Sequence, residues 1–158
     1  PNAVTPELAE QLIAALESQP DSTKVRDDNF KRRTHLQTGP ELSELLDKKL
    51  VKSVFPEIEK VFYDRVTHRE TYKICLYASE NSGAFGRHRD TIDPYRHRRY
   101  AMTLALNDDY EGGEFHLIDE EYNLSKGDII VFPSNFMYPH KVEPVTKGTR
   151  YSYISWIW

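Results

Sequence analysis

Cysteine is almost absent from this chain, which has Cys75 as its single thiol in 158 residues. One cysteine excludes an intrachain disulfide framework and any multi-cysteine zinc site. Because Cys75 lies in the apolar run ICLY, we expect it to be a small buried side chain. The chemistry of this protein therefore does not depend on clustered thiols.

The chain also lacks long apolar runs and an excess of positive charge. No stretch approaches the roughly 18 apolar residues that a membrane-spanning helix needs, and no signal peptide is recognisable, so a cytoplasmic location is expected. The formal net charge of −4 argues against a general nucleic-acid-binding protein. Hydrophobic residues make up 39% and charged residues 29%, as in ordinary globular proteins, and the length fits one domain spanning residues 1–158.

The N-terminal part has the periodicity of amphipathic helices. The segment TPELAEQLIAALES predicts a helix that Thr5 caps and that begins at Pro6, where the missing N–H costs nothing. The segment ELSELLDKKLVKSVF predicts a second helix, and EIEKVFYDRV a shorter third one. Residues 1–66 are therefore expected to be mostly helical support.

From residue 71 the pattern changes to short segments rich in β-branched and aromatic residues, separated by Gly, Pro, Asn or Asp. These segments are TYKICLYAS, YAMTLALN, GEFHLID, GDIIVFPS, HKVEPV and RYSYISWIW. Many short strands with turn signals are typical of a sandwich or jelly roll. We predict an α+β, mainly β protein, in which residues 71–158 form a jelly-roll core that N-terminal helices buttress. The EGGEF glycines, Gly112 and Gly113, are free to take positive φ and predict a tight turn without a catalytic role.

The segment FGRHRDTID contains His-Arg-Asp, the tripeptide that opens the catalytic loop of protein kinases. The kinase interpretation is excluded because the following Asn, a Gly-rich phosphate loop and Asp-Phe-Gly are all missing. The other interpretation is a metal site. In an extended segment His88 and Asp90 point the same way, so a nitrogen and an oxygen can meet at one ion.

A third metal ligand is needed, and His140 is the best candidate because it follows a buried-looking strand and a Pro-bounded turn. Two His and one carboxylate with open positions are the ligand arrangement of non-haem Fe(II) oxygenases. On these residues alone, a surface ion pair between His88 and Asp90 remains an alternative.

A buried anion site is suggested by Arg150 and Ser152, which share one face of the last predicted strand. An Arg inside a β-sandwich is costly unless it meets an anion, and its guanidinium suits a carboxylate. The alternative is that Arg150 faces outward while Tyr151 and Tyr153 face inward, and the alternation does not decide between the two.

Four segments occur in an order and spacing that resemble a known family: HRD, LNDDYEGGEF, KGDIIVFPSNFMYPHKVEPV and GTRYSYISW. Residues 71–158 resemble 2-oxoglutarate- and Fe(II)-dependent dioxygenases of the prolyl-4-hydroxylase-like group. The resemblance implies a double-stranded β-helix fold. It assigns His88, Asp90 and His140 to the iron, and it assigns Arg150, with Ser152, to the distal carboxylate of 2-oxoglutarate.

Two further residues are expected at the cosubstrate: Tyr77, which resembles the family's tyrosine upstream of the metal motif, and Thr103, on a predicted strand that lines the pocket. The implied cofactors are Fe(II) and 2-oxoglutarate, with ascorbate as a candidate additional requirement. The implied reaction uses O2, releases succinate and CO2, and hydroxylates an unactivated C–H of an amino acid, a peptidyl residue such as prolyl, or a small metabolite.

Two other functions stay open at this point. A cupin-like metal hydrolase or isomerase uses similar ligands but leaves Arg150 unexplained. A non-enzymatic binding module could use the basic segment 87–99. For the enzyme, the same segment predicts a positive rim in which Arg96 or Arg98 docks an anionic substrate. A solvated charged loop is the simpler interpretation of that segment.

Overall fold

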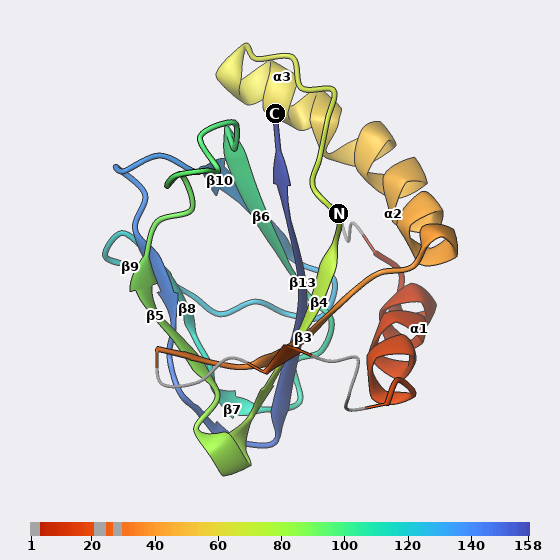
Figure 1. Ribbon diagram of the computed structural model, residues 1–158, viewed down its shortest axis with the longest axis vertical. Helices are drawn as coiled ribbons and strands as arrows, with labels where there is room; N and C mark the ends of the chain where they lie inside the picture. The colour runs from red at the N-terminus through yellow and green to blue at the C-terminus, as the bar shows by residue number, and fades with distance from the viewer. Residues whose placement is uncertain (1–3, 21–24, 27–29) are drawn as a thin grey trace.

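Two β-sheets face each other in the computed structural model, which describes residues 4–20, 25–26 and 30–158. The larger sheet lies between the helices and the smaller sheet (Figure 1). The helices within the described residues are α1 (Pro6–Glu17), α2 (Pro40–Ser53) and α3 (Phe55–Phe62), so the three helical segments predicted from the sequence are confirmed.

The strands pair mostly as antiparallel neighbours that are distant in sequence, as in a jelly roll. The larger sheet has the order β1 (Val25–Arg26), β3 (Thr34–Gln37), β4 (Lys73–Ala78), β13 (Thr149–Ile157), β6 (Tyr100–Ala105) and β10 (Ile129–Pro133). The smaller sheet has the order β2 (Lys31–Arg32), β5 (Ala84–His88), β11 (His140–Val142), β8 (Phe115–Leu117) and β9 (Glu120–Tyr122). A separate pair joins β7 (Glu111–Gly112) to β12 (Val145–Lys147).

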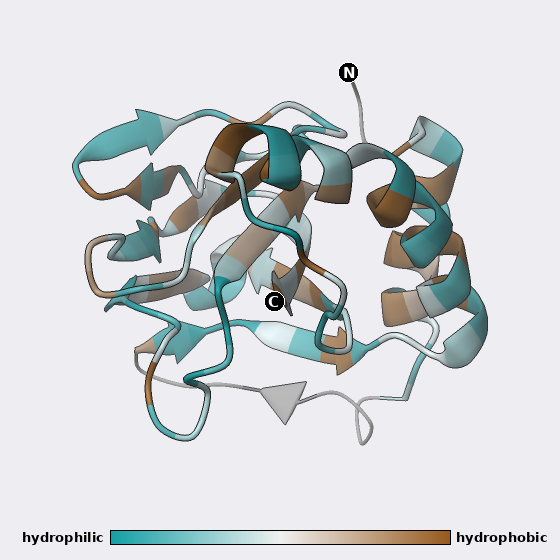
Figure 2. Cartoon of the chain, turned by 90° about the horizontal axis from the view of Figure 1, so that it is seen from above, coloured by the Kyte–Doolittle hydropathy of each residue, from teal (hydrophilic) through white to brown (hydrophobic). Residues whose placement is uncertain are grey.

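The helices pack on the larger sheet through one apolar face. The Thr5 hydroxyl accepts a hydrogen bond from the N–H of Leu8 at 3.4 Å, which caps α1 as predicted. Leu12 of α1 and Leu46 of α2 have no exposed surface. The helices in Figure 2 accordingly alternate brown and teal bands along their length. Burying each such leucine stabilises the fold by about 1.5–3 kcal/mol.

The polar segment between α1 and α2 contributes strands to both sheets, which its residue pattern does not predict. In the described part of that segment, β3 pairs with β4 of the larger sheet, with His35 opposite Cys75. A few residues earlier, β2 pairs with β5 of the smaller sheet, with Lys31 opposite Phe85. The segment therefore crosses from one sheet to the other.

Strand β13 lies in the middle of the larger sheet, between β4 and β6, and its side chains join a different core on each face. Tyr153 and Ile157 join the core beneath the helices, whereas Trp156 joins a second core between the sheets. The space between the sheets is where the candidate site lies. No helix among the described residues has the length and apolar character that crossing a membrane requires.

Candidate metal centre

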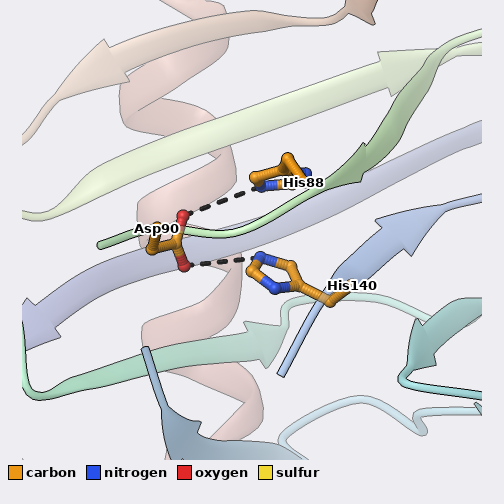
Figure 3. Close-up of side chains that lie close together, drawn as sticks. All are labelled: His88, Asp90 and His140. Atoms are coloured by element: carbon orange, nitrogen blue, oxygen red, sulfur yellow. Dashed lines mark ion pairs between the residues drawn. The ribbon is translucent and has the colours of Figure 1, made fainter. Parts of the chain in front are cut away.

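The strand register brings the three predicted metal ligands together. His88 ends β5, Asp90 follows it by two residues, and His140 begins β11. Because β5 and β11 are antiparallel neighbours, His140 lies directly opposite His88. The three side chains converge on one point between the strands (Figure 3).

The donor atoms of these three side chains have the spacing of a single-ion site. The His88 Nε2 lies 3.7 Å from one oxygen of Asp90, and the His140 Nε2 lies 3.4 Å from the other. All three ligand atoms lie within 4.8 Å of one another. Ligands that bind one ion at about 2.1 Å stand roughly 3–4 Å apart, so the geometry fits one divalent cation.

Both imidazole rings are oriented by the backbone. The His88 Nδ1–H donates to the carbonyl of Gly86 at 2.8 Å, and the His140 Nδ1–H donates to the carbonyl of Tyr138 at 3.2 Å. A carbonyl can only accept, so each Nδ1 carries the proton and each Nε2 presents its lone pair to the centre. Such outer hydrogen bonds fix the tautomer of metal-binding histidines.

The surroundings of His88 keep its imidazole neutral. Burial holds the pKa of His88 well below its usual range, and the neighbouring His140 lowers it further. The His88 ring stacks on Phe85 with centroids 3.6 Å apart, and the His140 ring packs against Phe132 at 4.8 Å. A neutral imidazole is the form that binds a metal ion.

Arg150 supplies a buried positive charge in the same cavity. Its side chain is 1% exposed, and its Nη1 donates to the Ser152 hydroxyl at 3.1 Å. Its guanidinium also lies 5.2 Å from the ring of Tyr77, the residue opposite it on β4. Within the described residues no carboxylate lies within ion-pair distance of Arg150, and its Nε has no hydrogen-bond partner. A buried guanidinium in this state suits an anionic ligand.

The cavity is lined by residues from both sheets, and it contains most of the predicted site residues. Tyr77 and Thr103 are both buried there. The lining residues are Arg33, Tyr77, Phe85, His88, Asp90, Ala101, Met102, Thr103, Phe115, Phe132, His140, Val142, Arg150, Ile154 and Trp156.

Arg33 is a charged cavity residue that sequence reasoning missed. It is 8% exposed, its Nη1 donates to the Tyr77 hydroxyl at 3.4 Å, and its guanidinium lies 4.8 Å from the Phe85 ring. Arg33 comes from the polar segment between α1 and α2, which has no periodicity that could have pointed to the cavity.

The two arginines predicted to dock a substrate have partners within the chain. Arg98 is buried, its Nε and Nη2 both donate to Glu70 at 2.6 and 2.7 Å, and the Trp156 ring covers it at 3.6 Å. Arg96 is exposed and donates to Asp93 at 2.5 and 2.9 Å. The geometry thus gives Arg98 the surroundings of a structural residue.

Comparison with known proteins agrees with this geometry. Residues 72–158 match the 2OG-Fe(II) oxygenase superfamily. A PKHD-type hydroxylase from Synechococcus sp. (strain JA-2-3B'a(2-13)) is 27% identical over 126 residues, which cover 72% of this chain and 55% of the relative. The chain therefore spans about half the length of this curated relative.

The fold is that of solved prolyl hydroxylases. A Pseudomonas putida prolyl-4-hydroxylase superposes with a TM-score of 0.81 at 18% identity, over 99% of this chain and 88% of that one. A Trichoplax adhaerens prolyl hydroxylase in complex with a peptide fragment superposes with a TM-score of 0.71 at 16% identity, over 97% and 77%. The predicted double-stranded β-helix is confirmed, and, by the match over residues 72–158, the chain belongs to the 2OG-Fe(II) oxygenase superfamily.

Proposed function

We propose that this protein is an Fe(II)- and 2-oxoglutarate-dependent dioxygenase that hydroxylates an unactivated C–H bond of a peptidyl residue. The observation that carries the proposal is one cavity that holds both a two-His, one-carboxylate centre and a buried arginine without a carboxylate partner among the described residues. The first feature fits Fe(II), and the second fits the far end of a dicarboxylate cosubstrate.

The roles of the residues follow from their positions. His88, Asp90 and His140 hold the metal and leave its remaining positions open. Arg150 binds the distal carboxylate of 2-oxoglutarate, and the Ser152 hydroxyl orients the guanidinium. The bound Fe(II) and cosubstrate supply the oxidising power, since one atom of O2 enters the succinate that forms with CO2 and the other enters the substrate as hydroxyl.

The walls of the cavity exclude water from the reacting groups. Phe115, Phe132 and Trp156 line it, and each is less than 10% exposed. Burial also raises the pKa of Tyr77, so its hydroxyl stays protonated and can donate a hydrogen bond inside the cavity. These features favour a water-poor, oriented environment around the metal.

The two alternative functions lose support. A hydrolase or isomerase with the same metal ligands has no use for a buried Arg150. A binding module that uses the basic segment 87–99 needs unpaired arginines, but most of them are neutralised by carboxylates. The pairs are Arg87–Asp119, Arg96–Asp93, Arg98–Glu70 and Arg99–Asp64.

A peptidyl substrate is favoured by the loops that flank the metal ligands. The loop after Asp90 and the loop before His140 are tied together by a hydrogen bond from the Thr91 N–H to the Ser134 carbonyl at 3.1 Å. These loops expose Ile92 at 49%, Phe136 at 72% and Met137 at 62%. Exposed apolar side chains on these loops suit a chain that extends beyond the cavity better than they suit a free amino acid. The peptide complex of the Trichoplax enzyme supports the same substrate class.

Succinate formation tests the proposal directly. Protein reconstituted with Fe(II) under nitrogen should release succinate only when 2-oxoglutarate and O2 are both added, and ascorbate should prolong turnover. A His140→Ala variant, with an unchanged far-UV circular dichroism spectrum, should release none. Succinate release by that variant, or turnover in the absence of 2-oxoglutarate, would refute the dioxygenase assignment.

The substrate class is tested with a peptide library and a panel of free amino acids, read by mass spectrometry for a gain of one oxygen atom. Hydroxylation of peptides, weakened by Phe136→Ser, is expected. Exclusive hydroxylation of free amino acids contradicts the peptidyl assignment and leaves the dioxygenase assignment intact.

A further inference from the structure

Gly113 is a buried glycine close to Arg150, and it has no role in the mechanism proposed above. Its φ of +70° lies in the left-handed region that L side chains rarely adopt. Its N–H donates to the Pro144 carbonyl at 3.2 Å, and the next residue, Glu114, accepts from the Glu143 N–H at 3.0 Å. The backbone at Gly113 is therefore held on both sides and cannot easily retreat.

A side chain at position 113 would crowd the stem of Arg150. A Cβ atom built there lies 3.0 Å from the Arg150 Cδ and 3.0 Å from a methyl carbon of Val145, with the Tyr110 ring at 3.3 Å. Ordinary carbon contacts are about 3.5–4.0 Å. An alanine at position 113 would therefore require its neighbours, the Arg150 stem among them, to shift by a few tenths of an ångström.

The position of the Arg150 guanidinium depends on that stem. The guanidinium is held by the Ser152 hydroxyl and lies over the Tyr77 ring, and the stem that carries it runs past the space where a Gly113 side chain would lie. A bidentate pair with a carboxylate needs two parallel N–H···O bonds, and it is lost when the plane of the guanidinium turns.

We propose that Gly113 is a positioning residue for the cosubstrate: its missing side chain leaves the space that lets Arg150 aim at the distal carboxylate of 2-oxoglutarate. The inference rests on the proposed role of Arg150. It gives the second glycine of EGGEF a role beyond the tight turn that the sequence predicts.

Gly113→Ala tests this inference, and Gly148→Ala is its matched control. Gly148 has a φ of +75°, so alanine meets the same backbone strain there, but it is exposed and its nearest neighbours are Asp109 and Tyr110 at 3.3–3.5 Å, not Arg150. The KM for 2-oxoglutarate is read from succinate release, and Fe(II) affinity is read by anaerobic titration.

We expect Gly113→Ala to raise the KM for 2-oxoglutarate about tenfold over Gly148→Ala, with Fe(II) affinity unchanged, since small misplacements of binding groups have effects of this order or larger. In a double-mutant cycle, Gly113→Ala should add nothing once Arg150→Ala is present, because both changes act through one guanidinium. Equal KM values in the two glycine variants, or additive effects in the cycle, overturn the inference.

The same experiment separates this inference from the proposed function. If Arg150→Ala raises the KM and Gly113→Ala does not, the inference fails and the dioxygenase stands. If Arg150→Ala leaves the KM unchanged, the cosubstrate role of Arg150 fails and the inference is overturned with it. Should Gly113→Ala be poorly folded, the cycle is read as unfolding free energy. If adding Arg150→Ala restores the unfolding free energy that Gly113→Ala lowers, the crowding of the Arg150 stem is supported. If the unfolding free energy is not restored, the inference is overturned.

Discussion

The two faces of β13 have different surroundings and different roles. One face looks toward the helices and carries Tyr151, Tyr153, Ser155 and Ile157, and the other looks into the cavity and carries Arg150, Ser152, Ile154 and Trp156. Both faces are largely buried. The helix face meets leucines of α1 and α2, whereas the cavity face holds a guanidinium in the same cavity as the candidate metal ligands.

This difference shows where stability and function reside. Apolar burial on the helix face contributes free energy of folding in proportion to its area. A buried cation without a carboxylate partner costs folding free energy, and it is retained where a ligand repays the cost. Substitutions on the helix side should therefore reduce stability, and substitutions on the cavity side should reduce activity.

The largest difference between the loss of activity and the loss of stability is expected for Asp90→Ala, in the cavity. Turnover should fall to background because two imidazoles alone do not hold a catalytic ion firmly. The unfolding free energy of the metal-free protein should change by less than about 1 kcal/mol, since removing a buried carboxylate relieves its desolvation cost. Urea unfolding and succinate release measure the two effects.

Metal addition provides the control for Asp90→Ala. Fe(II) added under nitrogen should raise the melting temperature of the wild-type protein, because an ion that binds only the folded state stabilises it. The variant should show little or no rise. An equal rise in both proteins would mean that the ion binds elsewhere.

On the helix face, Leu50→Ala should produce the opposite result. Leu50 of α2 is 1% exposed in the core beneath the helices. Its truncation should lower the unfolding free energy by about 2–5 kcal/mol through lost transfer free energy and a residual cavity. The KM for 2-oxoglutarate should stay unchanged in the fraction that remains folded. A shifted KM would show that the helices influence the cavity.

Most of the fold was predictable because its signals are local. The helices begin at Thr5-Pro6 and at Pro40, and the C-terminal strands follow β-branched runs between turn residues. The polar segment that forms β1, β2 and β3 was not predictable, since its strands pair with partners distant in sequence and have no apolar alternation of their own.

The candidate site was predictable to a similar extent. The spacing of His88 and Asp90 predicts two candidate ligands, and the resemblance of the C-terminal segments points to His140 and Arg150. The direction of Arg150 was not decidable from alternation, because a central strand covered on both faces has apolar residues on each. The ion pair between Arg98 and Glu70 was not predictable either, because the two residues lie far apart in the sequence and no local pattern links them.

Ser152→Ala should give a moderate effect, confined to the cavity face. The Ser152 hydroxyl accepts from the Arg150 Nη1 at 3.1 Å, and both side chains are about 1% exposed. Losing this hydrogen bond should cost about 1 kcal/mol of cosubstrate binding, which is about a fivefold rise in the KM for 2-oxoglutarate. Ser155→Ala, on the opposite face of the same strand, is the control and should leave that KM unchanged.

The smallest effect is expected for a polar cluster on the helix side, formed by Asp47, Arg69 and Tyr72. Asp47 of α2 accepts hydrogen bonds from Arg69 at 2.6 and 2.7 Å and from the Tyr72 hydroxyl at 2.5 Å. The hydrogen bond with Arg69 is the main cause that lowers the pKa of Asp47 in the folded protein, and Tyr72 adds to it. A lowered pKa stabilises the fold above the pKa of the unfolded chain, and this contribution is lost as the pH falls through the folded value.

Asp47→Asn should therefore reduce stability at pH 7 and leave it nearly unchanged in strong acid. Because the Asp47 side chain is 40% exposed, the loss at pH 7 should be below about 1 kcal/mol. Urea midpoints of both proteins at neutral pH and near pH 2 measure the difference. If the difference between the two urea midpoints is as large near pH 2 as at neutral pH, the asparagine disturbs packing. A gap accompanied by altered succinate release would show that the two faces of β13 are coupled through Tyr72, whose ring meets Tyr153 edge-on at 5.4 Å.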